Sequence, residues 1–144
     1  MMPSPTPGAP RDHMNALLAL LVPFARDTIG EHGEFFPFGA TMLPDGELQT
    51  AATWEGTETP AADAVLDTLR SGLRSRADRG ELLAIGVVAG VTLEEGEYPL
   101  GIRVELEHRD GDPITCVVPY RETDEGYEYG AVFAFDGQRR TWDA

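Results

Sequence analysis

The segment that most constrains the fold is Phe35–Trp54, FFPFGATMLPDGELQTAATW, which has the pattern of two strands joined by a tight turn. The triplet Pro44–Gly46 suits that turn, because proline presets φ and glycine accepts a left-handed conformation. A three-residue loop pairs Leu43 with Glu47. Because strand side chains alternate between faces, this register places the apolar residues on one side. They are Phe36, Phe38, Ala40, Met42, Leu48 and Trp54. The segment therefore predicts a sheet with one buried face.

A helix is predicted before this hairpin, from about Asp12 to Gly33, because apolar residues recur there at helical spacing. The recurring residues are Leu17, Leu18, Leu21, Ala25 and Ile29. Pro23 lies inside the pattern and either kinks the helix or opens a second short one. The element is apolar on nearly all sides, so it is buried in the domain or packed against another subunit. The second possibility predicts a homodimer.

A second helix is predicted from about Pro60 to Asp78, after an N-cap at Thr59. Its core stripe consists of Ala62, Val65, Leu66, Leu69, Leu73 and Ala77. Asp63, Asp67, Arg70 and Arg74 share another side of the helix, three or four residues apart. This spacing predicts an exposed ladder of ion pairs.

The remaining residues read as strands. The apolar run Leu82–Leu93 is typical of a central strand buried on both faces. Gly86 and Gly90 allow a helix or a ligand to approach its backbone, and close packing of the second helix is the favoured use. Leu100–His108 alternates, and a three-residue loop with Gly111 in the left-handed position joins it to a partner strand. One face of that partner carries Ile114, Cys116, Val118 and Tyr120. A last strand presents Tyr127, Tyr129, Ala131, Phe133 and Phe135 on a single face.

These elements predict the α+β class. We expect a single twisted, mainly antiparallel sheet of five to six strands with two helices, in the order α-β-β-α-β-β-β-β. The length of 144 residues favours one domain, which we place at residues 12–144. Residues 1–11 are rich in proline and have nothing to bury, so they predict a disordered tail.

Charge narrows the range of partners. The formal net charge is −14, which disfavours nucleic acids and anionic membranes as partners. It favours a basic protein partner, or it only keeps the protein soluble.

The apolar run Leu17–Ala25 is too short to span a bilayer. A single cysteine, Cys116, excludes an intrachain disulfide, so a cytoplasmic location is expected.

Polar side chains suggest two candidate sites. The first is a ligand-binding set of Glu34, Arg103, Glu107, His108 and Tyr120. A carboxylate beside a histidine suits acid–base chemistry, although a surface strand with alternating charges is the commoner explanation for Arg103, Glu105 and Glu107. The second is a protein-binding set of Glu125, Tyr127, Glu128 and Tyr129, unless the tyrosines fill the core instead. No catalytic residue, metal or cofactor is predicted, because nucleophile and metal-ligand motifs are missing.

Three short stretches carry a resemblance. Gly33–Ala40 (GEFFPFGA), Leu106–Gly111 (LEHRDG) and Val118–Tyr120 (VPY) resemble segments of a group of small bacterial proteins of uncharacterised function. The resemblance implies a stand-alone cytoplasmic domain and brings no known activity.

Two functions are therefore predicted as alternatives. One is a non-catalytic acidic protein that binds a basic partner, such as an immunity-type protein that neutralises a toxin. The other is a small enzyme or ligand-binding domain, which requires the Glu/His/Arg/Tyr set to converge in a pocket.

Overall fold

The computed structural model describes residues 10–33, 37–51, 62–93 and 96–142, apart from the side chains of His32, Ala51, Ala62 and Asp63. The elements are α1 (Pro10–His32), β1 (Phe38–Met42), β2 (Leu48–Ala51), α2 (Ala62–Asp78), β3 (Ala84–Thr92), β4 (Leu100–His108), β5 (Gly111–Thr123), β6 (Gly126–Tyr129) and β7 (Phe133–Asp136). The predicted α+β class with a mainly antiparallel sheet is confirmed. Over these residues the sheet has seven strands, where the sequence predicts five to six.

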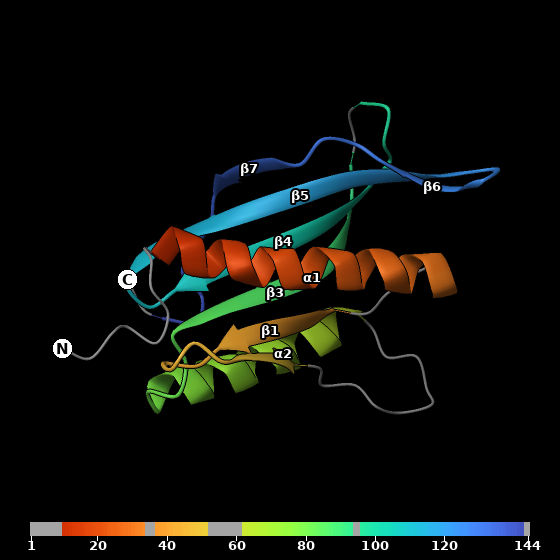
Figure 1. Ribbon diagram of the computed structural model, residues 1–144. Helices are drawn as coiled ribbons and strands as arrows, with labels where there is room; N and C mark the ends of the chain where they lie inside the picture. Colours follow the sequence, from red (N-terminus) through yellow and green to blue (C-terminus); the bar gives the residue numbers. More distant parts are fainter. Residues whose placement is uncertain (1–9, 34–36, 52–61, 94–95, 143–144) are drawn as a thin grey trace.

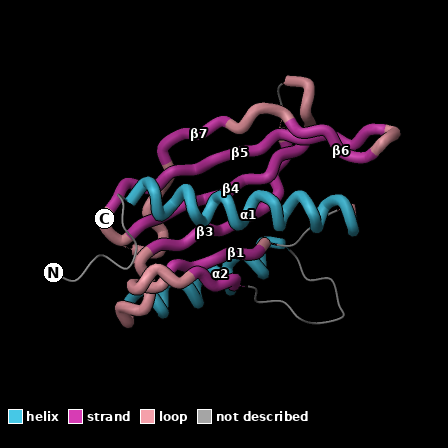
Figure 2. The backbone as a smooth tube through the Cα atoms, in the orientation of Figure 1, coloured by secondary structure: helices cyan, strands magenta, loops and turns pink. Residues whose placement is uncertain are grey.

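The strands form one sheet in the order β2-β1-β3-β4-β5, and both β6 and β7 pair with the outer edge of β5. All of these pairs are antiparallel. Because β1 lies between β2 and β3, the connection through α2 crosses over one face of the sheet. Figures 1 and 2 show α1 on the opposite face, in front of β3 and β4 and running roughly along the strands, with α2 behind β1.

The first hairpin has the predicted register. Met42 pairs with Leu48 and Ala40 with Thr50. The N–H of Leu43 donates to the carbonyl oxygen of Glu47 at 2.8 Å, and Gly46 has a φ of 93°, as the turn requires. The predicted pairing of Phe36 with Trp54 lies outside the described residues.

Helix α1 covers one face of the sheet with the predicted stripe. Leu17, Leu21, Ala25 and Ile29 are at most 1% exposed. The helix begins at Pro10, two residues before the predicted start, because proline is compatible with a first helical turn. It also continues through Pro23, so the alternative of a separate short helix that starts at this proline is wrong. Among the described residues, neither helix combines the length and apolar character needed to cross a bilayer.

Gly86 in β3 allows a helix to approach closely, but the helix is α1 and not the predicted α2. A β-carbon at Gly86 would lie 2.5 Å from a methyl group of Leu21 and 3.2 Å from one of Leu106. The sequence prediction was wrong because Gly86 shares its sheet face with Ala84 and Val88, which contact α1.

The second hairpin has the predicted register but a different turn. Leu106 pairs with Ile114, whereas His108 pairs with Gly111, so a bulge separates the two pairs and the loop contains only two residues. Gly111 is not left-handed, which corrects the prediction. Glycine fits here because a β-carbon at this position would lie 2.5 Å from Cβ of Pro10, at the start of α1.

Helix α2 covers only part of the other face. Leu69, Leu73 and Ala77 pack in a second core cluster with Ile85 and Val87 of β3. As predicted, β3 is buried on both faces over most of its length, because α1 and α2 contact its two sides. The surface of β4, β5 and β7 on the α2 side extends beyond this helix.

The predicted last strand is divided into β6 and β7. Tyr129 pairs with Tyr120, but Phe133 pairs with Val117, so the register shifts by one residue between the two strands. A shift of one residue reverses the face on which every following side chain lies. Phe133 and Phe135 therefore lie on the α2 side, which corrects the prediction that they share a face with the tyrosines.

Candidate binding surface on the α2 side of the sheet

The part of the sheet beyond α2 is here called the open face, and it is defined by Arg103 and Glu105 of β4 and by Phe133 and Phe135 of β7. Pairing between the strands aligns the residues of the open face in rows. Arg103 and Phe133 flank Val117 of β5, while Glu105 and Phe135 flank its Thr115. The two phenylalanine side chains are 46% and 51% exposed, and their rings stack with centroids 6.3 Å apart. An exposed aromatic pair on a strand at the sheet edge is a feature of interaction surfaces.

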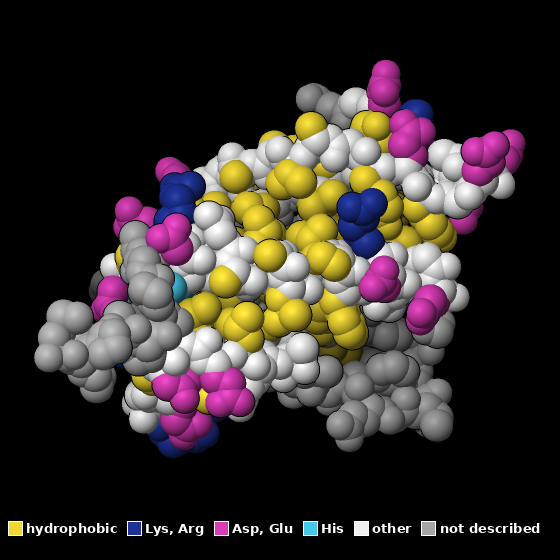
Figure 3. Space-filling model, in the orientation of Figure 1, with side chains coloured by type: hydrophobic (Ala, Val, Ile, Leu, Met, Phe, Trp, Pro, Cys, Tyr) yellow, Lys and Arg dark blue, Asp and Glu magenta, His cyan; other side chains and the backbone are white. Residues whose placement is uncertain are grey.

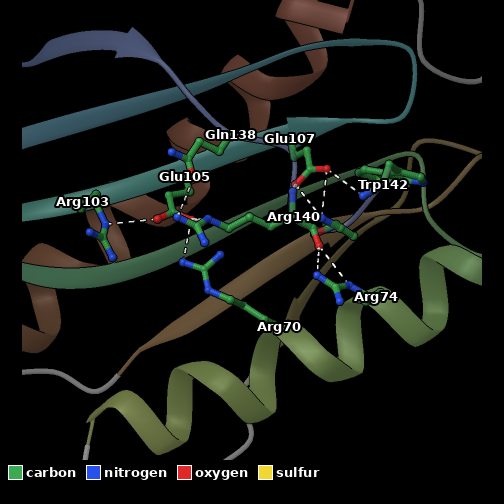
Figure 4. Close-up of polar contacts among 9 residues, drawn as sticks. Arg70, Arg74, Arg103, Glu105, Glu107, Gln138, Arg140 and Trp142 are labelled. Carbon is green, nitrogen blue, oxygen red and sulfur yellow. Dashed lines mark hydrogen bonds and ion pairs between the residues drawn. The ribbon is translucent and has the colours of Figure 1, made fainter. Parts of the chain in front are cut away.

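Three arginine side chains surround Glu105 (Figure 4). Nη2 of Arg70, from α2, lies 2.7 Å from Oε2 of Glu105. Nε of Arg103 lies 3.3 Å from Oε1, and Nε of Arg140 lies 3.6 Å from Oε2. We call these three residues the arginine cluster. One carboxylate faces three guanidinium groups, so the site is locally positive in a chain whose net charge is −14.

The C-terminal segment, residues 138–142, brings Arg140 to this cluster. The buried carboxylate of Glu107 accepts hydrogen bonds from three consecutive backbone N–H groups, those of Arg140, Thr141 and Trp142, at 2.8–3.1 Å. Arg74 donates to the carbonyl oxygen of Arg140 from α2, at 2.6 Å through Nη2 (Figure 4). These contacts hold the backbone at Arg140 and leave its side chain directed at Glu105.

The arginines of α2 thus contact residues of other elements, which their spacing in the sequence does not indicate. The prediction of an exposed ladder placed Arg70 and Arg74 in ion pairs along the helix. In the structure Arg70 reaches Glu105 of β4, and Arg74 reaches the C-terminal segment. Helical spacing reveals which residues share a side of a helix, but not which strand or segment lies opposite.

Within the described residues, two hollows are found along the open face. The larger, about 590 Å³, is mostly apolar and is lined in part by Leu93, Tyr98, Pro119 and Phe133. The smaller, about 170 Å³, lies at the arginine cluster and is lined by Arg103, Glu105, Thr115, Phe135, Asp136, Gly137, Gln138 and Arg140. Strand β7 contributes to both. The surface therefore combines an apolar region with a charged one, in which arginines lie beside carboxylates.

The predicted ligand-binding set does not converge. Arg103 and Glu107 lie on the α2 side of the sheet, whereas His108 and Tyr120 lie on the α1 side and are 2% and 6% exposed. Glu34 is outside the described residues. Alternation along the strands separates these residues, and the oxygens of Glu107 are occupied by backbone N–H groups.

The predicted protein-binding set is divided between core and surface. The rings of Tyr127 and Tyr129 lie 6.2 and 5.7 Å from that of buried Tyr120, and the guanidinium group of Arg26 lies over Tyr129. Glu125 and Glu128 are exposed at the β5–β6 turn. The tyrosines thus belong to one end of the core, the alternative that the sequence left open. Whether the set binds a partner stays a prediction.

The predicted homodimer concerned α1. The inner stripe of this helix is buried in the domain itself, and Leu18, Leu20 and Val22 are half-buried. Phe24 is 52% exposed, with its ring 4.9 Å from that of Phe38. Figure 3 shows hydrophobic side chains across this side of the molecule and most acidic ones at its margins. The homodimer stays a prediction.

A pair of buried histidines was missed by sequence reasoning, because 95 residues separate them. Nδ1 of His13, in α1, lies 2.9 Å from Nε2 of His108, in β4. The backbone N–H of Asp110 donates to Nδ1 of His108, so in the neutral ring Nε2 carries the proton and donates to His13. Burial, with a contribution from nearby His13, lowers the pKa of His108. The pair links α1 to the sheet in its uncharged form.

This pair predicts a loss of stability on mild acidification. The unfolded chain binds a proton on His108 with a pKa of about 6.5, above the lowered pKa of the folded state. The stabilisation is therefore complete above pH 6.5 and is lost as the pH falls through the folded-state pKa. Urea unfolding at pH 7.5 and 5.5 measures the change. The variant His108→Gln should show a smaller pH dependence, and an unchanged dependence would contradict this assignment.

Comparisons with known proteins identify no relative. The chain matches no protein-family model, no curated protein and no solved structure. The resemblance to small bacterial proteins therefore stays a prediction, and a function has to be inferred from the geometry of the open face.

Proposed function

We propose that this chain is a non-catalytic binding protein that holds an extended segment of a protein partner against the open face. The observation that carries the proposal is the exposure of Phe133 and Phe135, side by side on a strand at the edge of the sheet. Preceding Val132 is also 53% exposed. Apolar surface gathered on one short strand beside a hollow is unusual for a monomer and fits an interface.

The backbone of β7 supports the same proposal. Among the described residues, β7 pairs only with β5, so its other edge is available to an added strand. An extended peptide that pairs with such an edge gains main-chain hydrogen bonds, and its alternate side chains reach the face of the sheet. There they would contact Phe133, Phe135 and the apolar hollow near Tyr98.

The polar groups of the open face favour binding over catalysis. A general acid or base must be able to exchange a proton with a substrate. Glu107 is 4% exposed and accepts hydrogen bonds from backbone N–H groups, and Glu105 is held among three arginines. Both carboxylates thus already have structural partners, which is why we propose no reaction.

A second candidate function is the binding of a basic protein, as an immunity-type protein would do, at the β5–β6 turn. The observation that favours it is a group of four exposed carboxylates, those of Glu122, Asp124, Glu125 and Glu128, close to Arg121. Figure 3 shows acidic side chains gathered at this end of the molecule. Such a surface would attract a basic partner in a salt-dependent manner.

One selection experiment tests both functions. A phage-displayed random peptide library is selected on the wild-type protein and on the variant Phe133→Ser/Phe135→Ser. We expect the wild type to enrich peptides with apolar residues near a carboxylate. The variant should lose at least about tenfold in affinity for them, because tenfold corresponds to about 1.4 kcal/mol and truncating an aromatic hot-spot residue costs about 2 kcal/mol or more.

The outcomes separate the two surfaces. Peptides that bind the wild type and the variant equally would contradict the role of β7. If the enriched peptides are rich in Arg or Lys, lose affinity in high salt and do not bind Glu122→Gln/Glu125→Gln, the acidic turn is the binding surface. Thermal unfolding of each variant checks that the fold is retained.

A further inference from the structure

We infer that the arginine cluster binds a carboxylate group. This deepens the proposed function, on which it rests for the identity of the partner, by naming the chemical group that the partner presents. The cluster itself can be tested with small carboxylates and without a partner.

The first argument is an excess of donors. Arg103 makes an ion pair with Glu105, but its buried Nε has no hydrogen-bond partner within the described residues. Arg140 is 44% exposed and donates to Gln138 through Nη2. Glu105 has two oxygens for three guanidinium groups, each of which carries five N–H donors. Donors therefore remain at the smaller hollow for a further acceptor.

The second argument is the charge and size of the hollow. Arg103 and Arg140 line it together with Glu105 and Asp136, and Arg70 pairs with Glu105 from outside the lining. These five side chains carry one net positive charge, which balances a singly charged group but not a doubly charged one such as phosphate. A carboxylate carries a single charge, and its two oxygens match the fork of a guanidinium group. A volume of about 170 Å³ accommodates a carboxylate with a short side chain.

The third argument is the neighbouring aromatic surface. Phe135 lines the hollow at the arginine cluster, and Phe133, stacked on it, lines the apolar hollow. A ligand that fills both carries an apolar group next to its carboxylate. Such a carboxylate comes from an Asp or Glu side chain or from the free C-terminus of a peptide.

The experiment follows the side-chain Nε–H signals of the arginines by NMR at constant ionic strength. Sodium acetate, sodium 3-phenylpropionate and sodium phosphate are titrated separately into the full chain. We expect saturable shifts at Arg103 and Arg140 with both carboxylates, tighter with 3-phenylpropionate, and weaker binding of phosphate. A lack of saturation, or phosphate binding more tightly than 3-phenylpropionate, would overturn the inference.

The variant Arg140→Gln tests the site directly. The backbone of Arg140 holds the C-terminal segment through Glu107 and Arg74, so replacing its side chain leaves that anchor intact. We expect affinity for 3-phenylpropionate to fall at least about tenfold, as for the loss of a charged hydrogen bond. Arg109→Gln, in an exposed turn beside Asp110, is the matched control and should bind like the wild type. Equal affinity in Arg140→Gln would refute the site.

Two further arms define the source of the carboxylate and separate this inference from the proposed function. A peptide with a free C-terminus and no acidic side chain is compared with an amidated peptide that contains Glu, and the tighter binder identifies the source. If acetate still shifts the arginine signals in Phe133→Ser/Phe135→Ser while library selection yields no peptide, the carboxylate site stands and the peptide-binding function fails.

Discussion

Replacing Gly39 by alanine is expected to lower the free energy of unfolding by about 3 kcal/mol, at the upper end of the usual cost of overpacking a core. A β-carbon at Gly39 would lie 2.5 Å from the carbonyl oxygen of Gly86 in the neighbouring strand. Because this obstacle is backbone within the sheet, it cannot rotate away as a side chain would. Strands β1 and β3 would have to separate, and β1 lies between β3 and the first hairpin's second strand.

Urea unfolding measures this effect, and Gly30→Ala is the matched control. Gly30 lies in α1, and a β-carbon there meets nothing within 4 Å. Since alanine favours a helix over glycine by about 1 kcal/mol, the same substitution should be stabilising at this position. A loss of less than about 1 kcal/mol in Gly39→Ala would show that the sheet relaxes around the added methyl group.

Replacing Glu107 by alanine is expected to cost about 3 kcal/mol, because it removes a buried charged acceptor from three backbone N–H groups. The C-terminal segment should be destabilised before the rest of the protein. The amides of Arg140, Thr141 and Trp142 should exchange faster with deuterium, because the C-terminal segment loses its anchor. The arginine cluster should then lose the fixed position of Arg140.

Hydrogen exchange followed by mass spectrometry, together with urea unfolding, tests this role of Glu107. Glu125→Ala removes a carboxylate from an exposed turn and should change stability by less than about 0.5 kcal/mol. Unchanged exchange in the C-terminal segment of Glu107→Ala would show that other contacts hold it. Glu107 is therefore best described as a positioning residue for Arg140, and the acid–base role that its sequence position suggested is not supported by its contacts.

The three glycine-based predictions from sequence had different outcomes for a physical reason. Gly46 is left-handed in a loop whose length and composition are local, so the turn was predictable. Gly86 and Gly111 are needed because α1 packs against them, through Leu21 and Pro10. Each of those contacts joins residues far apart in the chain, and no local pattern encodes them.

The residues of the open face could not be predicted from local sequence patterns either. The side on which Phe133 and Phe135 lie depends on one residue of register between β6 and β7. Apolar residues alternate through this break as they would in a single strand, so the sequence predicted the wrong face for Phe133 and Phe135. The cluster of Arg70, Arg103 and Arg140 joins a helix, a strand and the C-terminal segment, and nothing in their spacing indicates that they meet.

The amino-acid sequence by itself determined the α+β class and the strand register of both hairpins, although it predicted the turn of the first hairpin only. It also determined the buried stripe of α1 and the central position of β3. These depend on periodicity and turn chemistry, which act over a few neighbouring residues. The tertiary structure alone decided how far α2 covers its face of the sheet, where the arginines gather, and that His13 meets His108. Those features depend on which distant elements pack together, and a hydrophobic pattern specifies that an element is buried without specifying its neighbour.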